Sequence, residues 1–289
     1  MKLLVLGSKG FLGSYFTKQA ELKNHQRFES LRDVNIELSH EKFTETSLNR
    51  LEGLVAGFDL VVNCVAMRNI EACEENPDLA EFSNSTFPGE LSRAVASNGN
   101  KLIHFSTDAV YSETNVYRTE NETCTPKSQY GKSKLRGEER ILESGSNALI
   151  CRTNFFGIAP KRDSLADFFL GAAKTGVAVK GYTDVYFAPL HASEVIEIAV
   201  SLASKKVSGI VNVMSQEKTS KYNFALKLLE KLNLDSDLII PTNSREDCYR
   251  ESLRNVDLSA DTQKLQELTG HRYNLSDSLQ RFAKIETGV

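Results

Sequence analysis

The residues that could do chemistry begin with Tyr130 and Lys134, which stand four positions apart in the segment Tyr-Gly-Lys-Ser-Lys. Residues at i and i+4 share one face of a helix, so both side chains can act on one ligand. A phenol has a pKa near 10, and a nearby ammonium lowers that pKa and eases proton transfer at neutral pH. We therefore predict a tyrosine proton-transfer site, in which the Thr107 hydroxyl hydrogen-bonds the substrate oxygen.

A glycine-rich turn near the start of the chain predicts a phosphate-binding loop. Residues 7–13 read GxxGxxG between an apolar run and a helix-like stretch. Glycine allows a tight turn and close backbone approach to a pyrophosphate, and a helix N-terminus favours negative charge. A plain tight turn is the alternative. The expected cofactor-binding residues here are Gly7, Gly10, Phe11, Leu12 and Gly13.

The choice between the two nicotinamide dinucleotides depends on the end of the expected second strand, residues 28–32. An acid about 20 residues after the glycines favours NAD, whereas a nearby arginine favours NADP. Arg32 stands at the strand end and Asp33 follows it, so the sequence contains a candidate residue for either cofactor. Arg32 would pair with a 2′-phosphate, and we expect NADP(H) rather than NAD(H). Either residue alone could equally be a solvated surface charge.

The elements that position these residues alternate between strand and helix. Short apolar runs at 2–6, 59–66, 101–106 and 148–152 are typical of buried parallel strands. Helical spacing of apolar residues marks the intervening stretches, most clearly at 11–22 and 77–97. This order predicts an α/β fold, a doubly wound Rossmann sheet with a smaller C-terminal substrate-binding lobe.

The second half of the chain supplies that lobe. We expect residues 1–153 to form the dinucleotide-binding core, with 189–214 returning to it as a helix and a strand. Residues 154–188 and 215–289 would form the lobe. Residues 155–188 are expected to be irregular, and two amphipathic helices are expected in 215–289.

Composition narrows the class of protein. The 289 residues include 35 basic and 38 acidic side chains, a net charge of −3 that argues against a nucleic-acid partner. No apolar run approaches the roughly 20 residues of a membrane span, and the apolar start is short for a signal peptide. The five cysteines are an odd number without a CxxC pair, which disfavours zinc and disulfides. We expect a cytoplasmic protein without a metal or a membrane partner.

Taken together, these motifs resemble the extended short-chain dehydrogenases/reductases, most closely the dTDP-4-dehydrorhamnose reductase type of sugar-nucleotide proteins. The resemblance covers about the first 160 residues well and the C-terminal stretch around 255–265 more loosely. The matching segments are 7–13, 59–66, 69–71, 74–77, Asn84, 104–111, Pro126, 130–134 with 137–138, and 152–157.

The resemblance implies site residues and partners. Thr107, Tyr130 and Lys134 would be the catalytic set, and Asn84 would support the lysine through water. The remaining positions would bind the cofactor (Cys64, Val65 and Ala66) or the substrate (Asp108, Thr153, Asn154 and Arg254). The partner would be a nucleotide-sugar, and a homodimer is the expectation for the superfamily. Other candidates for its diphosphate are Lys161, Arg162, Lys180 and Arg250.

Departures from the family pattern shape the functional prediction. Related dehydratases carry an acid directly after the Thr-Asp pair, where this chain has Ala109, so we reject dehydration. Related reductases usually carry a tryptophan-containing stretch after the Arg-Thr pair. This chain has Asn154-Phe155-Phe156 there and no tryptophan, so the sequence does not identify the sugar. We predict reduction of a nucleotide-linked keto-sugar, in the first place a 4-keto-6-deoxyhexose. The alternatives are an epimerase, suggested by Pro189 and His191, and a non-catalytic NAD(P)-binding regulatory subunit; a structural role is favoured for His191.

Overall fold

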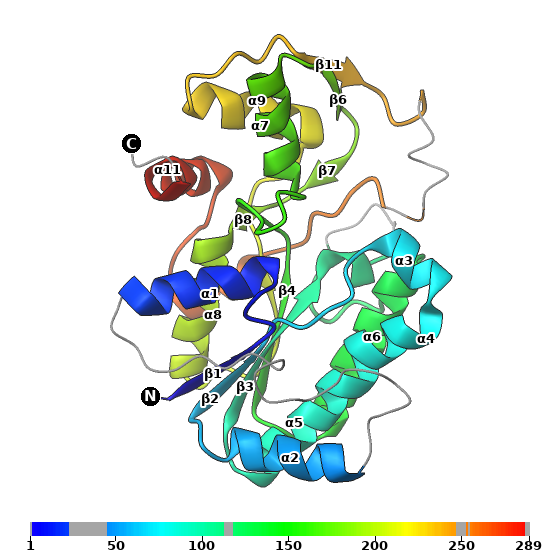
Figure 1. The fold of residues 1–289 in the computed structure, drawn as a ribbon, viewed down its shortest axis with the longest axis vertical. Helices are drawn as coiled ribbons and strands as arrows, with labels where there is room; N and C mark the ends of the chain where they lie inside the picture. The colour runs from blue at the N-terminus through cyan, green and yellow to red at the C-terminus, as the bar shows by residue number, and fades with distance from the viewer. Residues whose placement is uncertain (1, 23–44, 113–117, 247–252, 254, 287–289) are drawn as a thin grey trace.

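The computed structural model describes residues 2–22, 45–112, 118–246, 253 and 255–286. A parallel sheet occupies the lower half of Figure 1, with strands in the order β1-β2-β3-β4-β9. These strands are β1 (Leu3–Leu6), β2 (Leu60–Asn63), β3 (Lys101–Thr107), β4 (Ala148–Thr153) and β9 (Gly209–Val213). The predicted α/β fold with a parallel sheet is confirmed. The expected strand at 28–32, with Arg32 and Asp33, lies outside the described residues.

Helices cover both faces of the sheet, which is why its strands are apolar over most of their length, with polar residues such as Asn63 and His104 toward their carboxyl ends. Residues such as Val5, Val62 and Ile103 pack under α1 (Phe11–Leu22) and α8 (Ala192–Ser204). The alternate residues face α2 (Glu45–Val55), α5 (Phe87–Ser97) and α6 (Gln129–Glu143). Figure 1 shows these two layers on opposite sides of the strands. α10 (Gln263–Thr269) also joins the sheet's core, through Leu265.

The segment expected as one helix at 77–97 contains a π-helical turn. α4 (Pro77–Glu81) continues into η2 (Phe82–Thr86) and then α5, after the short helix α3 (Ile70–Glu75). Pro88 has no N–H to donate to the Asn84 carbonyl, and the Phe87 N–H bonds instead to Phe82. Gly137 of α6 lies against this turn, where an added Cβ would come within 2.1 Å of the Asn84 oxygen.

The C-terminal unit, in the upper half of Figure 1, surrounds a separate hydrophobic cluster that includes Phe156, Phe169, Phe224 and Phe282. Its sheets pair two strands each: β5 with β8, β7 with β10, and β6 with β11. The elements are β5 (Phe155–Phe156), α7 (Leu165–Thr175), β6 (Val179–Tyr182), β7 (Tyr186–Phe187), β8 (Leu190–His191), β10 (Thr219–Ser220), α9 (Lys221–Lys231), β11 (Ile239–Thr242) and α11 (Leu275–Glu286).

Helix α7 corrects the expectation that residues 155–188 are irregular. Ser164 and Asp167 form a capping box at its start, and Gly176 ends it with a φ of 69°. Both signals are readable in the sequence.

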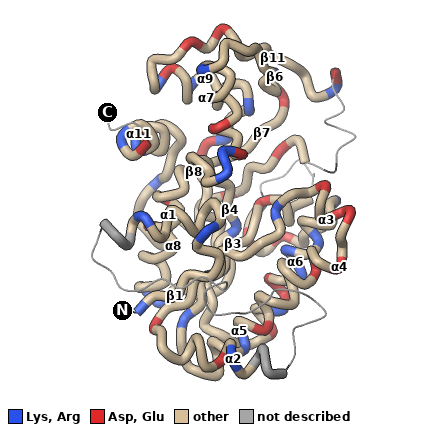
Figure 2. Tube along the Cα trace, viewed as in Figure 1, with Lys and Arg blue, Asp and Glu red and all other residues tan. Residues whose placement is uncertain are grey.

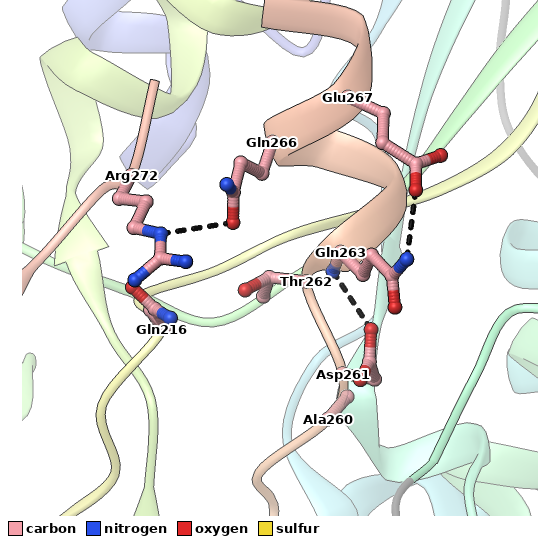
Figure 3. A pocket seen from close by; sticks show the side chains of 8 residues that line it. All are labelled: Gln216, Ala260, Asp261, Thr262, Gln263, Gln266, Glu267 and Arg272. Atoms are coloured by element: carbon pink, nitrogen blue, oxygen red, sulfur yellow. Dashed lines mark hydrogen bonds between the residues drawn. The ribbon is translucent and has the colours of Figure 1, made fainter. Parts of the chain in front are cut away.

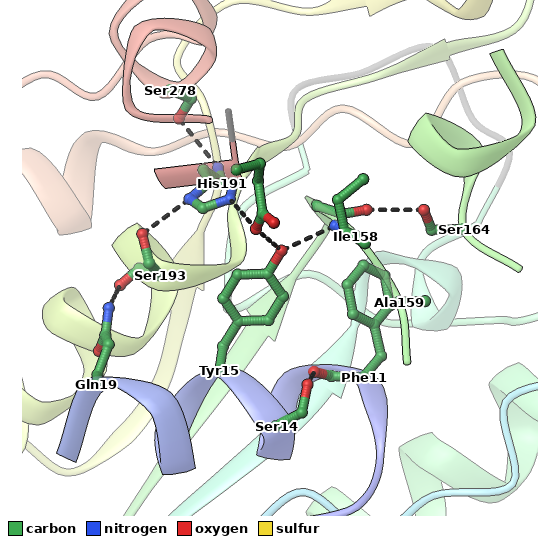
Figure 4. Close-up of polar contacts among 12 residues, drawn as sticks. Phe11, Ser14, Tyr15, Gln19, Ile158, Ala159, Ser164, His191, Ser193 and Ser278 are labelled. Carbon is green, nitrogen blue, oxygen red and sulfur yellow. Dashed lines mark hydrogen bonds and ion pairs between the residues drawn. The ribbon is translucent and has the colours of Figure 1, made fainter. Parts of the chain in front are cut away.

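A polar cluster joins the C-terminal helix to the helix that follows the glycine turn (Figure 4). The buried Tyr15 hydroxyl donates to the Glu286 carboxylate and accepts the Ile158 N–H at 2.8 Å. His191 lies beside it, with Nδ1 2.8 Å from the Ser193 hydroxyl and Nε2 3.9 Å from Glu286. His191 therefore helps hold the two units together.

Basic and acidic residues are mixed in both halves of the described chain, as Figure 2 shows. The helices described here include none with the length and apolar character needed to cross a membrane.

Two glycine substitutions test the close approach of α6. Gly137→Ala should lower the free energy of unfolding by about 1–3 kcal/mol, because the new methyl overlaps a backbone oxygen. Gly171→Ala, inside α7, is the matched control: its Cβ would meet nothing within 4 Å, so stability should rise by about 0.5–1 kcal/mol. Urea unfolding of both variants measures this. Equal stability of the two would contradict the packing.

Candidate active site

The glycine turn has the geometry of a phosphate cradle. Gly7 has a φ of 83°, and the Gly10 N–H donates to its carbonyl at 2.8 Å just before α1 begins at Phe11. An added Cβ at Gly13 would lie 2.1 Å from the Gly7 oxygen. The turn thus depends on small residues and leaves the start of α1 open to a pyrophosphate, so the chain fits a dinucleotide there.

The loop after β2 forms the neighbouring wall. An added Cβ at Gly7 would come within 2.9 Å of the Cys64 carbonyl carbon, which shows how closely the two loops approach. The Val65 N–H donates to the side chain of Asn63 at 3.0 Å, and Ala66 is exposed. The structure therefore brings Cys64 and Val65 beside the glycine turn, with Ala66 following them on the surface.

Tyr130 and Lys134 both lie on α6, which begins where the Ser128 hydroxyl accepts the Gly131 N–H at 3.1 Å. The Thr107 hydroxyl, at the end of β3, hydrogen-bonds Tyr130 and lowers the pKa of the phenol. Burial has the larger effect and raises that pKa to about 12. The phenol is therefore protonated at neutral pH.

The ammonium of Lys134 does not produce the expected lowering of the phenol pKa. Lys134 is only 1% exposed, and its Nζ donates to the Phe105 carbonyl at 2.7 Å and lies 3.2 Å from Nε2 of His104. Burial lowers the pKa of Lys134 itself to about 8. The sequence pattern places both side chains on one helical face, but only the folded structure shows this degree of desolvation.

Asp108 continues the line of polar groups from Tyr130 and Thr107. The Thr107 hydroxyl donates to the carboxylate of Asp108 at 3.2 Å, and the Asn154 amide donates to its other oxygen. Burial raises the pKa of Asp108 to about 6. Thr153, by contrast, donates its hydroxyl to the Val213 carbonyl at 2.8 Å and so supports the sheet.

Asn84 supports the site by fixing two segments. Its amide nitrogen donates to the Met67 carbonyl at 3.0 Å and to the Ser133 hydroxyl at 3.1 Å, and its oxygen accepts the Met67 N–H at 2.9 Å. The residue thereby ties the loop after β2 to α6, one position before Lys134.

A buried ion pair beneath the site was not anticipated from the sequence. Arg152 of β4 donates to Glu138 of α6 from Nε at 3.1 Å and from Nη2 at 2.7 Å. Its guanidinium also lies over the Tyr111 ring, 4.8 Å from the centroid. The sequence did contain a signal for it, because Tyr130, Lys134 and Glu138 are spaced four residues apart and so lie on one face of α6.

The basic residues expected to bind a diphosphate are dispersed. Arg162 pairs with Asp167 at 3.5 Å and Lys161 is exposed. Lys180 lines a cavity of about 340 Å³ with Tyr182 and aromatic residues of α7. Arg250 and Arg254 lie outside the described residues.

A second, polar cavity of about 470 Å³ lies along α10 (Figure 3). Its lining includes Asp261, Gln266 and Arg272, with the Arg272 Nε donating to Gln266 at 3.1 Å. No residue predicted from the sequence to bind cofactor or substrate lines this cavity.

Comparison with known proteins decides the family. Residues 1–284 match the family described as the RmlD substrate binding domain. The chain belongs to this family. The resemblance inferred from the motifs is therefore confirmed.

Several relatives show how far the likeness extends. A probable low-salt glycan biosynthesis reductase of Haloferax volcanii is 30% identical over 248 residues, 83% of each chain. A dTDP-4-dehydrorhamnose reductase of Mycobacterium tuberculosis is 28% identical, covering 85% of this chain and 80% of its own. A methionine adenosyltransferase 2 subunit beta of Bos taurus is 24% identical, covering 97% and 88%.

A solved structure confirms the fold. The dTDP-4-dehydrorhamnose reductase of Bacillus anthracis, determined in complex with NADP, superposes with a TM-score of 0.83. The match covers 99% of both chains at 19% identity.

Asp108→Asn tests the buried carboxyl. The folded pKa of about 6 exceeds the ordinary 3.8, so the folded protein binds the proton more tightly. Stability from this group is full below about pH 4 and is lost as the pH rises through 6. The stability of the wild type relative to Asp108→Asn should therefore fall by roughly 2–3 kcal/mol between pH 4 and pH 7. Urea titrations at several pH values measure this, and a constant difference would contradict the burial.

Proposed function

We propose that this protein is an NAD(P)H-dependent reductase of a nucleotide-linked keto-sugar, in the first place a 4-keto-6-deoxyhexose. The observation that carries the proposal is the position of Tyr130 on α6 beside Thr107, at the carboxyl end of β3, in the same sheet whose β1 leads into the glycine cradle. The names of the Haloferax and Mycobacterium relatives support the same class of reaction.

The site residues divide the work of a carbonyl reduction. The glycine turn and the loop from Cys64 to Ala66 would hold the dinucleotide, which supplies a hydride when bound. Thr107 donates to the substrate oxygen as negative charge develops on it. Tyr130 gives that oxygen its proton, because a phenol with a pKa of about 12 is protonated yet more acidic than a sugar hydroxyl. Lys134 orients the ribose of the cofactor.

NADP(H) is the proposed cofactor, on the position of Arg32 in the sequence and the NADP complex of the Bacillus structure. Asp108 and Asn154 would contact the sugar beside Thr107, since both hydrogen-bond within the same cluster. Ala109, following Asp108, offers no acid for dehydration. The epimerase alternative gains nothing from His191, whose contacts serve the junction between the two units.

A regulatory subunit is the second candidate, favoured by the similarity to methionine adenosyltransferase 2 subunit beta. Such a protein would bind the dinucleotide without turning it over. Both candidates would bind the cofactor, but only the reductase would oxidise it in the presence of a keto-sugar.

Tyr130→Phe tests the reductase. Loss of the proton donor should reduce kcat by about 100-fold to 10,000-fold, while the Kd of NADPH stays within about threefold. Steady-state assays of NADPH oxidation with a nucleotide 4-keto-sugar measure kcat, and titration of NADPH fluorescence measures the Kd.

The control is Tyr273→Phe, which removes a phenol whose ring packs on His271, 4.7 Å between centroids, away from α6. This variant should keep wild-type turnover. If Tyr130→Phe retained turnover within tenfold of the wild type, the assigned role of Tyr130 would be wrong.

A further inference from the structure

A chain of three buried polar side chains lies beneath the proposed active site. Asn63 and His104 are register partners on β2 and β3, and both are fully buried on the face covered by α6. The Asn63 amide nitrogen lies 3.1 Å from Nδ1 of His104. On the other side of the ring, Nε2 lies 3.2 Å from Nζ of Lys134.

The orientation of the Asn63 amide determines the histidine tautomer. The Val65 N–H donates to Asn63 Oδ1 at 3.0 Å, so the amide oxygen faces the backbone and the NH₂ group faces His104. An NH₂ group only donates, so Nδ1 must accept. A neutral imidazole has one donor and one acceptor, which places the ring proton on Nε2. The opposite tautomer would set two donors against each other in a fully buried position, at a high free-energy cost.

The Nε2 proton then points at Lys134. An ammonium has three donors and no acceptor, so it cannot accept this hydrogen bond. The neutral amine has one lone pair and can accept it, while still donating to the Phe105 carbonyl. The contact at 3.2 Å is therefore favourable only for the deprotonated lysine.

We propose that His104, oriented by Asn63, is a positioning residue that stabilises the neutral amine of Lys134. Its catalytic value rests on the proposed reductase function. Lys134 shares one face of α6 with Tyr130 and is proposed to orient the ribose of the cofactor. By stabilising the amine, the Nε2–H group of His104 would therefore set how much positive charge the phenol and the ribose meet.

The titratable groups that face Lys134 come from α6, from the loop after β2 and from β3. Glu138, on the same helix, raises the pKa of Lys134, but its carboxylate is already paired with Arg152 of β4. From the loop after β2, the Cys64 thiol faces the lysine, and burial raises the pKa of that thiol, which keeps it neutral. From β3, His104 is neutral because burial holds its pKa well below the usual value.

The first test is the tautomer of His104 in the intact wild-type protein. Long-range ¹H–¹⁵N NMR of ¹⁵N-histidine-labelled protein at pH 9.5, where a lysine with a pKa of about 8 is deprotonated, distinguishes the protonated from the unprotonated ring nitrogen, and His104→Gln assigns the signal. We expect the proton on Nε2. A proton on Nδ1, or a doubly protonated ring, would overturn the proposal. The measurement needs neither cofactor nor substrate, so its result is separate from the success of the reductase proposal.

The second test is the pKa of Lys134, followed by ¹³C NMR of labelled lysine side chains and assigned with Lys134→Arg. His104→Leu removes the donor without adding charge and should raise this pKa by about one pH unit or more. His104→Gln keeps an N–H donor and should bring the pKa back to within about half a unit of the wild type. An unchanged pKa in His104→Leu would refute the role of His104. Should the leucine variant fail to fold, the wild-type tautomer still decides.

Discussion

The burial of Lys134 beneath helix α6 is the constraint on which the rest of the site depends. A lysine that is 1% exposed requires nearby polar partners, and β3 supplies them through the His104 ring and the Phe105 carbonyl. On the face of the sheet that α6 covers, the paired residues Val61 and Leu102 are apolar. The next pair on that face, Asn63 and His104, lies nearer the carboxyl ends of the strands and is polar. The site is thus a continuation of the core in which hydrogen bonds replace apolar contacts.

Helix α6 can pack close to Asn63 and His104 because a glycine and a π-helical turn leave room for it. Gly137 has no side chain to strike the Asn84 carbonyl, and the π-helical turn around Asn84 presents that carbonyl and its amide to α6 and the loop after β2. Glu138 then pairs with Arg152 and ties the helix to β4. One helix face therefore carries the phenol, the lysine and the anchor that holds both in place.

The sequence was sufficient for the parallel sheet, because strands buried on both faces are mainly apolar runs, as at β1 and β2. The glycine spacing and the Tyr130–Lys134 repeat also located the two halves of the candidate site. Capping residues would have revealed α7 as well, since Ser164, Asp167 and Gly176 are its start and stop signals. The π-helical turn, the pairing of Asn63 with His104 and the high pKa of Tyr130 depend on contacts between distant segments. Local patterns carry no record of such contacts.

The central claim is that this chain transfers a hydride to a keto carbon of a nucleotide-linked sugar. The most direct measurement incubates the protein with NADPH carrying deuterium at the transferable position and a nucleotide 4-keto-6-deoxyhexose, followed by NMR of the sugar. Deuterium on the new carbinol carbon, with one oxidised cofactor formed for each sugar reduced, is the predicted result. An isomerised sugar without net cofactor oxidation, or tight cofactor binding with the sugar unchanged, would contradict it.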